Sequence, residues 1–72
     1  MEQQIEQLLL AEFDGAQLEL VLDGNRASID ICHAKFADMS RVKRQQAVYA
    51  CINDLITSGE LHAVTIVTRV PD

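Results

Sequence analysis

The chain has 72 residues, about half of them apolar, which suffices for one small domain over residues 1–72 but leaves no room for a cleft between two lobes. Its net charge is −5, from 11 acidic and 6 basic residues, so the molecule as a whole should repel polyanions such as nucleic acids. The apolar runs are too short to span a membrane, and the two cysteines lack CxxC spacing and are too few for a disulfide scaffold. No secretory signal pattern is present, so we expect a cytoplasmic, reduced protein without a membrane segment.

The charges are segregated along the chain. Residues 1–24 contain no lysine or arginine, and their acidic side chains are Glu2, Glu6, Glu12, Asp14, Glu19 and Asp23. Most of the cations lie close together between residues 35 and 44, namely Lys35, Arg41, Lys43 and Arg44. This polarity suits docking to a partner of complementary charge, whether protein or nucleic acid.

The first predicted element is a helix over residues 2–13. Its apolar residues recur at helical spacing, and they are Ile5, Leu8, Leu9 and Phe13. Asp14-Gly15 should end this helix, because glycine readily adopts the left-handed conformation of a helix cap.

A β-hairpin is predicted next. Residues 16–22 alternate, with Leu18, Leu20 and Leu22 on one face, and residues 27–33 alternate again with Ile29 and Ile31 inward. Asp23-Gly24-Asn25 between them is a turn signal.

Residues 36–39 indicate a bend or a short helical turn, after which Ser40 or Asp38 should serve as the N-cap of a long helix. The expected buried stripe of this helix consists of Val42, Val48 or Tyr49, Ile52, Leu55 and Ile56. The residues expected to face water are Arg41, Lys43, Arg44, Gln45 and Asn53. Ser58-Gly59 should end the helix, and the β-branched residues of 62–69 predict a strand.

The predicted order of elements is therefore α-β-β-α-β. A strand, a crossover helix and another strand favour parallel pairing of the two strands. Together with the hairpin this gives a mixed three-stranded sheet with both helices on one face, a two-layer α+β domain.

A family resemblance lies in the stretch Met39-Ser40-Arg41-Val42-Lys43-Arg44-Gln45-Gln46-Ala47-Val48-Tyr49, together with His62-Ala63 at the head of the last strand. These residues resemble the BolA family, and most closely its IbaG-like branch. The resemblance implies a class II KH-like fold. It also implies that His62 is a ligand of a [2Fe-2S] cluster shared with a monothiol glutaredoxin and glutathione, a cluster absent from the isolated protein. Because the family is also described as transcriptional and stress-linked, the alternative is a DNA-binding regulator.

The ligand set departs from the family pattern. From spacing alone, a strand-edge histidine that packs beside the long helix is the preferred interpretation of His62, and only the resemblance favours a ligand. The family usually has a second ligand, histidine or cysteine, in the hairpin loop. Here Arg26 stands near that position, and arginine stays protonated and cannot coordinate iron. Cys32 or His33 would be a substitute, although the preferred interpretation of Cys32 is a structural thiol on the face opposite Ile29 and Ile31.

The basic residues Arg41, Lys43 and Arg44, backed by Lys35, form a candidate docking site for the partner, for glutathione carboxylates or for DNA phosphates. The alternative is an ordinary solvated helix start. Without a GxxG loop and with few aromatic residues, nucleic-acid binding would be weak and salt-sensitive.

No arrangement for nucleophilic or acid–base catalysis and no zinc spacing appears, so an enzyme is not expected. Cys51 should be an inert thiol within the helix. A third possibility is an interaction module that binds protein only. By itself the chain should be a monomer or a weak homodimer.

Overall fold

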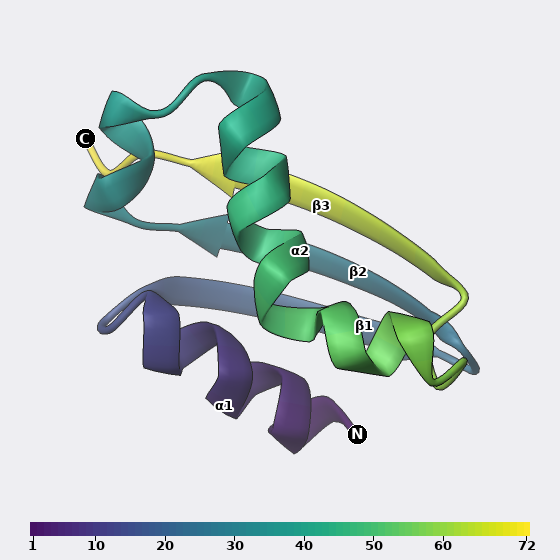
Figure 1. The fold of residues 1–72 in the computed structure, drawn as a ribbon. Coiled ribbons are helices and arrows are strands. Elements are labelled where there is room, and N and C mark those ends of the chain that lie inside the picture. The colour runs from purple at the N-terminus through teal and green to yellow at the C-terminus, as the bar shows by residue number, and fades with distance from the viewer.

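The computed structural model describes all 72 residues and forms two layers. The elements are α1 (Glu2–Glu12), β1 (Gln17–Asp23), β2 (Arg26–Cys32), the 3₁₀ turn η1 (Ala34–Asp38), α2 (Arg41–Thr57) and β3 (Ala63–Arg69). β2 is the central strand, antiparallel to β1 and parallel to β3. Both helices lie on one face of this sheet (Figure 1), which confirms the predicted α+β architecture.

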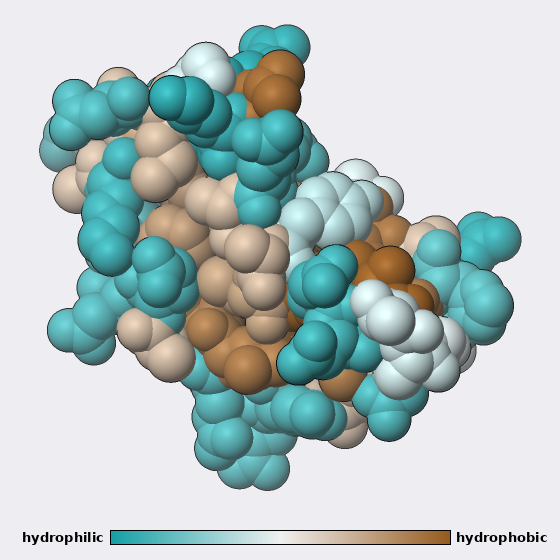
Figure 2. Space-filling view, viewed as in Figure 1, coloured by the Kyte–Doolittle hydropathy of each residue, from teal (hydrophilic) through white to brown (hydrophobic).

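The core lies between the sheet and the helices and consists entirely of apolar side chains. α1 contributes Ile5, Leu9 and Phe13, which have no exposed surface. Leu8, which also belongs to the predicted stripe, is 38% exposed and lines a groove against α2. Apolar surface between the two helices is visible in Figure 2. Neither helix combines the length and hydropathy needed to cross a bilayer.

The hairpin closes through a tight turn in which Asp23 pairs with Arg26. Gly24 has a φ of 60°, and no residue other than glycine has a positive φ. A positive φ at only the first central residue is the signature of a type II′ turn, which suits the twist of the flanking strands. The outer face of the sheet, away from the helices, is left uncovered, and alternate residues of all three strands face it.

α2 begins after Ser40, whose Oγ accepts a hydrogen bond from the backbone N–H of Lys43 at 3.2 Å. This confirms Ser40 as the N-cap. Val48, Ile52 and Leu55 form the buried stripe, but the prediction for Val42 was wrong, because its side chain is 64% exposed. At about 100° per residue, Val42 lies roughly 240° around the helix from Val48.

Gln45 occupies the place on the stripe where Val42 was expected. Its amide donates a hydrogen bond to the carbonyl of Ile66 in β3, with a nitrogen–oxygen distance of 3.0 Å. Arg44 is also partly buried, and its Nε donates to the carbonyl of Met39 at 3.1 Å. The expectation that both side chains simply face water is therefore corrected: each is used to fasten α2 to the rest of the fold.

Candidate metal-ligand site at the head of strand β3

His62 lies in the short connection between α2 and β3, directly after Leu61. The side chain of Leu61 is only 1% exposed, so it anchors this connection in the core. The backbone N–H of His62 donates to the carbonyl of Asn25 at 2.8 Å, and the N–H of Ala63 reaches the same oxygen at 3.5 Å. The backbone of His62 is thus held from one side by the core and from the other by the hairpin turn.

The imidazole of His62 is exposed, and neither ring nitrogen takes part in a hydrogen bond within the molecule. A neutral imidazole in this state has an unshared electron pair directed to solvent and is a suitable donor for iron or zinc. The alternative of a packed strand-edge histidine does not describe this ring. The structure therefore leaves His62 available as a ligand.

Arg26 is the nearest charged residue to this site in the sheet. The parallel register pairs Arg26 with Ala63, the residue that follows His62. Its side chain is exposed and forms no ion pair, although Asp23 stands opposite it in the hairpin. The position that the resemblance assigns to a second ligand is thus beside His62 in space, but a guanidinium group occupies it.

Cys32 and His33 lie at the other end of the sheet. β2 runs from Arg26, beside His62, to Cys32, which pairs with Arg69. At about 3.3 Å per residue this is a separation of roughly 20 Å. Cys32 and His33 therefore cannot ligate the same cluster as His62 of this chain. This corrects the prediction that one of them substitutes for the missing loop ligand.

The ring of His33 is also fully engaged. Its Nδ1 accepts the backbone N–H of Lys35 at 3.0 Å, which leaves Nε2 as the donor to the carbonyl of Asp14, at 2.9 Å. The ring meets Phe13 edge-on, with ring centroids 5.7 Å apart. These contacts tie the end of β2 to the loop after α1, so His33 has a structural role.

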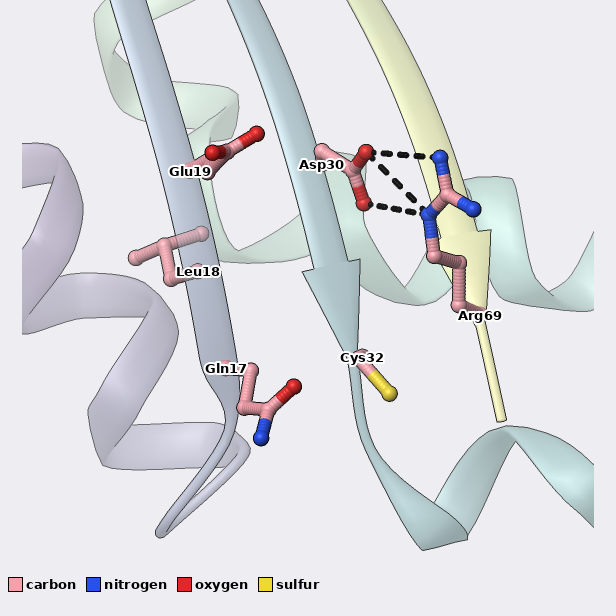
Figure 3. A pocket seen from close by; sticks show the side chains of 6 residues that line it. All are labelled: Gln17, Leu18, Glu19, Asp30, Cys32 and Arg69. Carbon is pink, nitrogen blue, oxygen red and sulfur yellow. Dashed lines mark hydrogen bonds and ion pairs between the residues drawn. The ribbon is translucent and has the colours of Figure 1, made fainter. Parts of the chain in front are cut away.

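Cys32 faces a hollow on the open side of the sheet, shown in Figure 3. Gln17 and Arg69 are its neighbours in register on the two adjacent strands. The guanidinium of Arg69 donates to both carboxylate oxygens of Asp30 at 2.9 to 3.2 Å, and these hydrogen bonds raise the pKa of Arg69. The charge next to Cys32 is therefore already paired.

Comparison with known proteins identifies the family. The family model described as "BolA-like protein" matches residues 23–72, which is most of the chain. The chain belongs to the BolA family.

Related sequences and structures agree with this assignment. A protein of Acinetobacter guillouiae from the rpoN–murA intergenic region is 39% identical over 64 residues, covering 89% of this chain and 77% of that protein. A protein of Buchnera aphidicola is 34% identical over 70 residues, covering 97% of this chain and 88% of that protein.

Two solved structures from Arabidopsis thaliana share the fold. BolA1 superposes with a TM-score of 0.87 at 25% identity, over 97% of this chain and 90% of that one. The BolA domain of SufE1 superposes with a TM-score of 0.86 at 28% identity, over 97% of this chain and 91% of that one. The IbaG-like branch stays a prediction.

The basic residues of this BolA domain do not form one free patch. Lys35 donates from Nζ to the carbonyl of Glu12 at 2.9 Å and lies 3.8 Å from the carboxylate of the same residue. Arg44 is bonded to Met39, as described above. Arg41 and Lys43 are exposed and unpaired, so these two remain for a partner or for DNA, and DNA binding stays a prediction.

This basic helix start is also far from His62. α2 comprises 17 residues and ends near the head of β3, so its first turn lies roughly 25 Å from that end. Arg41 and Lys43 therefore cannot contact glutathione carboxylates that lie beside His62. Docking by these two residues stays a prediction, and it would have to involve a part of a partner's surface away from His62.

The remaining thiol, Cys51, lies on α2 beside the groove against α1. Burial, followed by the negative charge of Glu12, raises the pKa of Cys51, and its Sγ donates to the carbonyl of Ala47 at 3.5 Å. A raised pKa lowers the thiolate fraction and with it the reactivity of the sulfur. No cluster of three or more His, Cys, Asp or Glu side chains is suitable for a metal ion.

Proposed function

We propose that this BolA-family domain pairs with a monothiol glutaredoxin in the cytoplasm and takes part in binding or transferring a [2Fe-2S] cluster. The observation that carries this proposal is the exposed, unpaired imidazole of His62 on a fixed backbone. Its donor chemistry fits one ligand position of a shared cluster. The guanidinium at Arg26 does not fit a second.

His62 would therefore be the only ligand from this chain, and the others would come from the partner and glutathione. Imidazole in place of a cysteine thiolate raises the reduction potential of such a cluster. This chain would fix the position of the His62 ligand and contribute a positive charge near it. Leu61 and the Asn25 carbonyl fix the backbone of His62, and Arg26 places a positive charge beside the anionic cargo.

His62→Ala tests this proposal. The variant protein is mixed with cluster-loaded monothiol glutaredoxin and glutathione, and visible absorption and circular dichroism are recorded together with the mass of the complex. We expect the spectrum of the heterodimer to change or disappear, because the imidazole donor is lost. An unchanged spectrum would exclude His62 as a ligand.

His33→Ala is the matched control, since it removes the other histidine of the chain. The nitrogens of His33 are already bonded and lie at the far end of the sheet, so the spectrum should match that of the wild type. Because His33→Ala also removes contacts that hold the fold, far-UV circular dichroism first establishes that the variant is folded. If the folded variant changed the spectrum as strongly as His62→Ala, the one-ligand proposal would be wrong.

Arg26→His examines the same site by adding a donor. The backbone at position 26 is adjacent to that of His62, since the register pairs residue 26 with Ala63 and the Asn25 carbonyl accepts the N–H of His62, so a second imidazole would be added at the same end of the sheet. We expect a heterodimer spectrum distinct from that of the wild type and slower loss of the cluster to a chelator. Arg26→Ala separates added ligation from loss of the positive charge, because it should retain the wild-type spectrum.

A further inference from the structure

The two edge strands of the sheet are treated very differently. In β3 the backbone of Arg69 points toward β2, since its carbonyl accepts the N–H of His33, and residues at even positions therefore point outward. Two of these outward carbonyls have partners from α2: Gln45 donates to Ile66 at 3.0 Å and the Tyr49 hydroxyl donates to Val64 at 3.4 Å. α2 thus occupies two of the acceptors on the β3 edge that a further strand would need.

The β1 edge has no such protection. Because Asp23 and Arg26 close the hairpin turn as a bonded pair, the backbone groups of Leu18, Leu20 and Leu22 point away from β2. No side chain donates to or accepts from these groups. The strand contains no proline, lysine or bulge, which are the usual features that keep an edge from pairing.

The charges that this edge itself carries are acidic. Glu19 and Asp23 extend from β1 on the open face of the sheet. On the other face, α1 directs Leu8 and Ala11 toward α2, so by helical periodicity its opposite flank, beyond β1, carries Glu2 and Glu6. Segment 1–24 supplies no lysine or arginine, and the cation nearest in register is Arg26, which stands opposite Asp23 at the hairpin turn and leaves Glu19 without a cation beside it.

We propose that the β1 edge binds an extended segment of a protein partner as a fourth strand, and that this segment alternates apolar and basic residues. Its backbone would pair with Leu18, Leu20 and Leu22 in the manner of β-augmentation. Its apolar side chains would continue the half-buried leucine row under α1, and its lysine or arginine side chains would face Glu19 and Asp23.

A second copy of this chain is the less favourable occupant. Antiparallel pairing of two β1 strands about Leu20 would place Glu19 diagonal to Asp23 of the other copy. It would also bring the Glu2 and Glu6 flanks of two α1 helices together between molecules that each carry a net charge of −5. The charge of the edge therefore selects a basic strand.

Amide hydrogen exchange measured by NMR tests this proposal. The probe is a short synthetic peptide that alternates valine and lysine, and the control peptide alternates valine and glutamate. Saturating lysine peptide should slow exchange at Leu18, Leu20 and Leu22 by about tenfold or more, and added salt should weaken the effect. The glutamate peptide should have no effect. Equal protection by both peptides, or protection located elsewhere, would overturn the proposal.

Two variants with the same change of charge complete the experiment. Glu19→Lys, at the edge, should weaken binding of the lysine peptide by roughly three- to tenfold, whereas Glu60→Lys, in the exposed loop after α2, should change it less than about twofold. Equal effects would indicate attraction to overall charge only and would contradict a strand site. Concentration-dependent protection without peptide, with a dimer mass in sedimentation, would show a second copy to be the occupant instead. None of these results depends on cluster binding.

Discussion

The two ends of the sheet carry similar residue types in opposite states. At the head of β3, the side chains of His62 and Arg26 are exposed and make no hydrogen bond or ion pair within the molecule. At the other end, His33 and Arg69 are engaged in hydrogen bonds or ion pairs. One end therefore keeps its polar groups available for a partner, while the other uses the same chemistry to hold the fold together.

The largest effect on stability should come from His33. His33→Ala removes two hydrogen bonds and an aromatic contact with Phe13, and we expect it to lower the free energy of unfolding by about 1–3 kcal/mol. His62→Ala should change it by less than about 0.5 kcal/mol, because the exposed ring has no partner to lose. Urea unfolding followed by far-UV circular dichroism measures both. Comparable losses for the two variants would remove the distinction between the ends.

A medium effect is expected for the adjacent glutamines of the family motif. Gln45→Ala loses the bond that caps the Ile66 carbonyl and should reduce the free energy of unfolding by roughly 0.5–1.5 kcal/mol. The side chain of Gln46 is exposed and forms no hydrogen bond, so Gln46→Ala is the matched control and should be nearly neutral. Urea unfolding followed by far-UV circular dichroism measures both variants, and equal losses would show that the Ile66 cap contributes nothing to stability.

The sequence predicts the elements well because hydrophobic periodicity determines them. The α1 stripe, the alternation of the hairpin and the β-branched last strand all lie within two residues of the expected bounds. The error at Val42 has a local cause: it is the first apolar residue of α2, but the inward position of that turn belongs to Gln45. Periodicity assigns a face by hydrophobicity, so a glutamine that points inward to cap a strand is missed.

The candidate site could be predicted only in part. That His62 is free to act as a ligand was predicted from the family resemblance and not from its spacing. A histidine at a strand edge can be either packed against a neighbouring helix or exposed. The bonds of His33 and Lys35 to the loop and last turn of α1 join residues 19 and 23 positions apart, and no local pattern encodes such contacts. The separation of His62 from Cys32 follows from the parallel register of β2 and β3. His62 comes just before the first residue of β3, which pairs with the first residue of β2, whereas Cys32 is the last residue of β2.

The smallest effect compares two lysines, one from each state. Lys35→Ala loses the hydrogen bond to the Glu12 carbonyl at the C-terminus of α1. A positive charge at this end of the helix is also stabilised by the negative end of the helix dipole. Because both side chains of the Lys35–Glu12 ion pair are more than half exposed, water screens most of that attraction. The loss should therefore be about 0.5–1 kcal/mol, and high salt should reduce it further.

Lys43→Ala is the control, since the Lys43 side chain is exposed and its role at the N-cap belongs to its backbone N–H. Removing a cation from the first turn of α2 should be neutral or slightly stabilising, by a few tenths of a kcal/mol, because the helix dipole disfavours positive charge there. A destabilising result would mean that Lys43 is tied into the fold as Lys35 is. A neutral result would show that Lys43 does not contribute to the stability of the fold and leaves its charge, like that of the exposed Arg41, available to a partner.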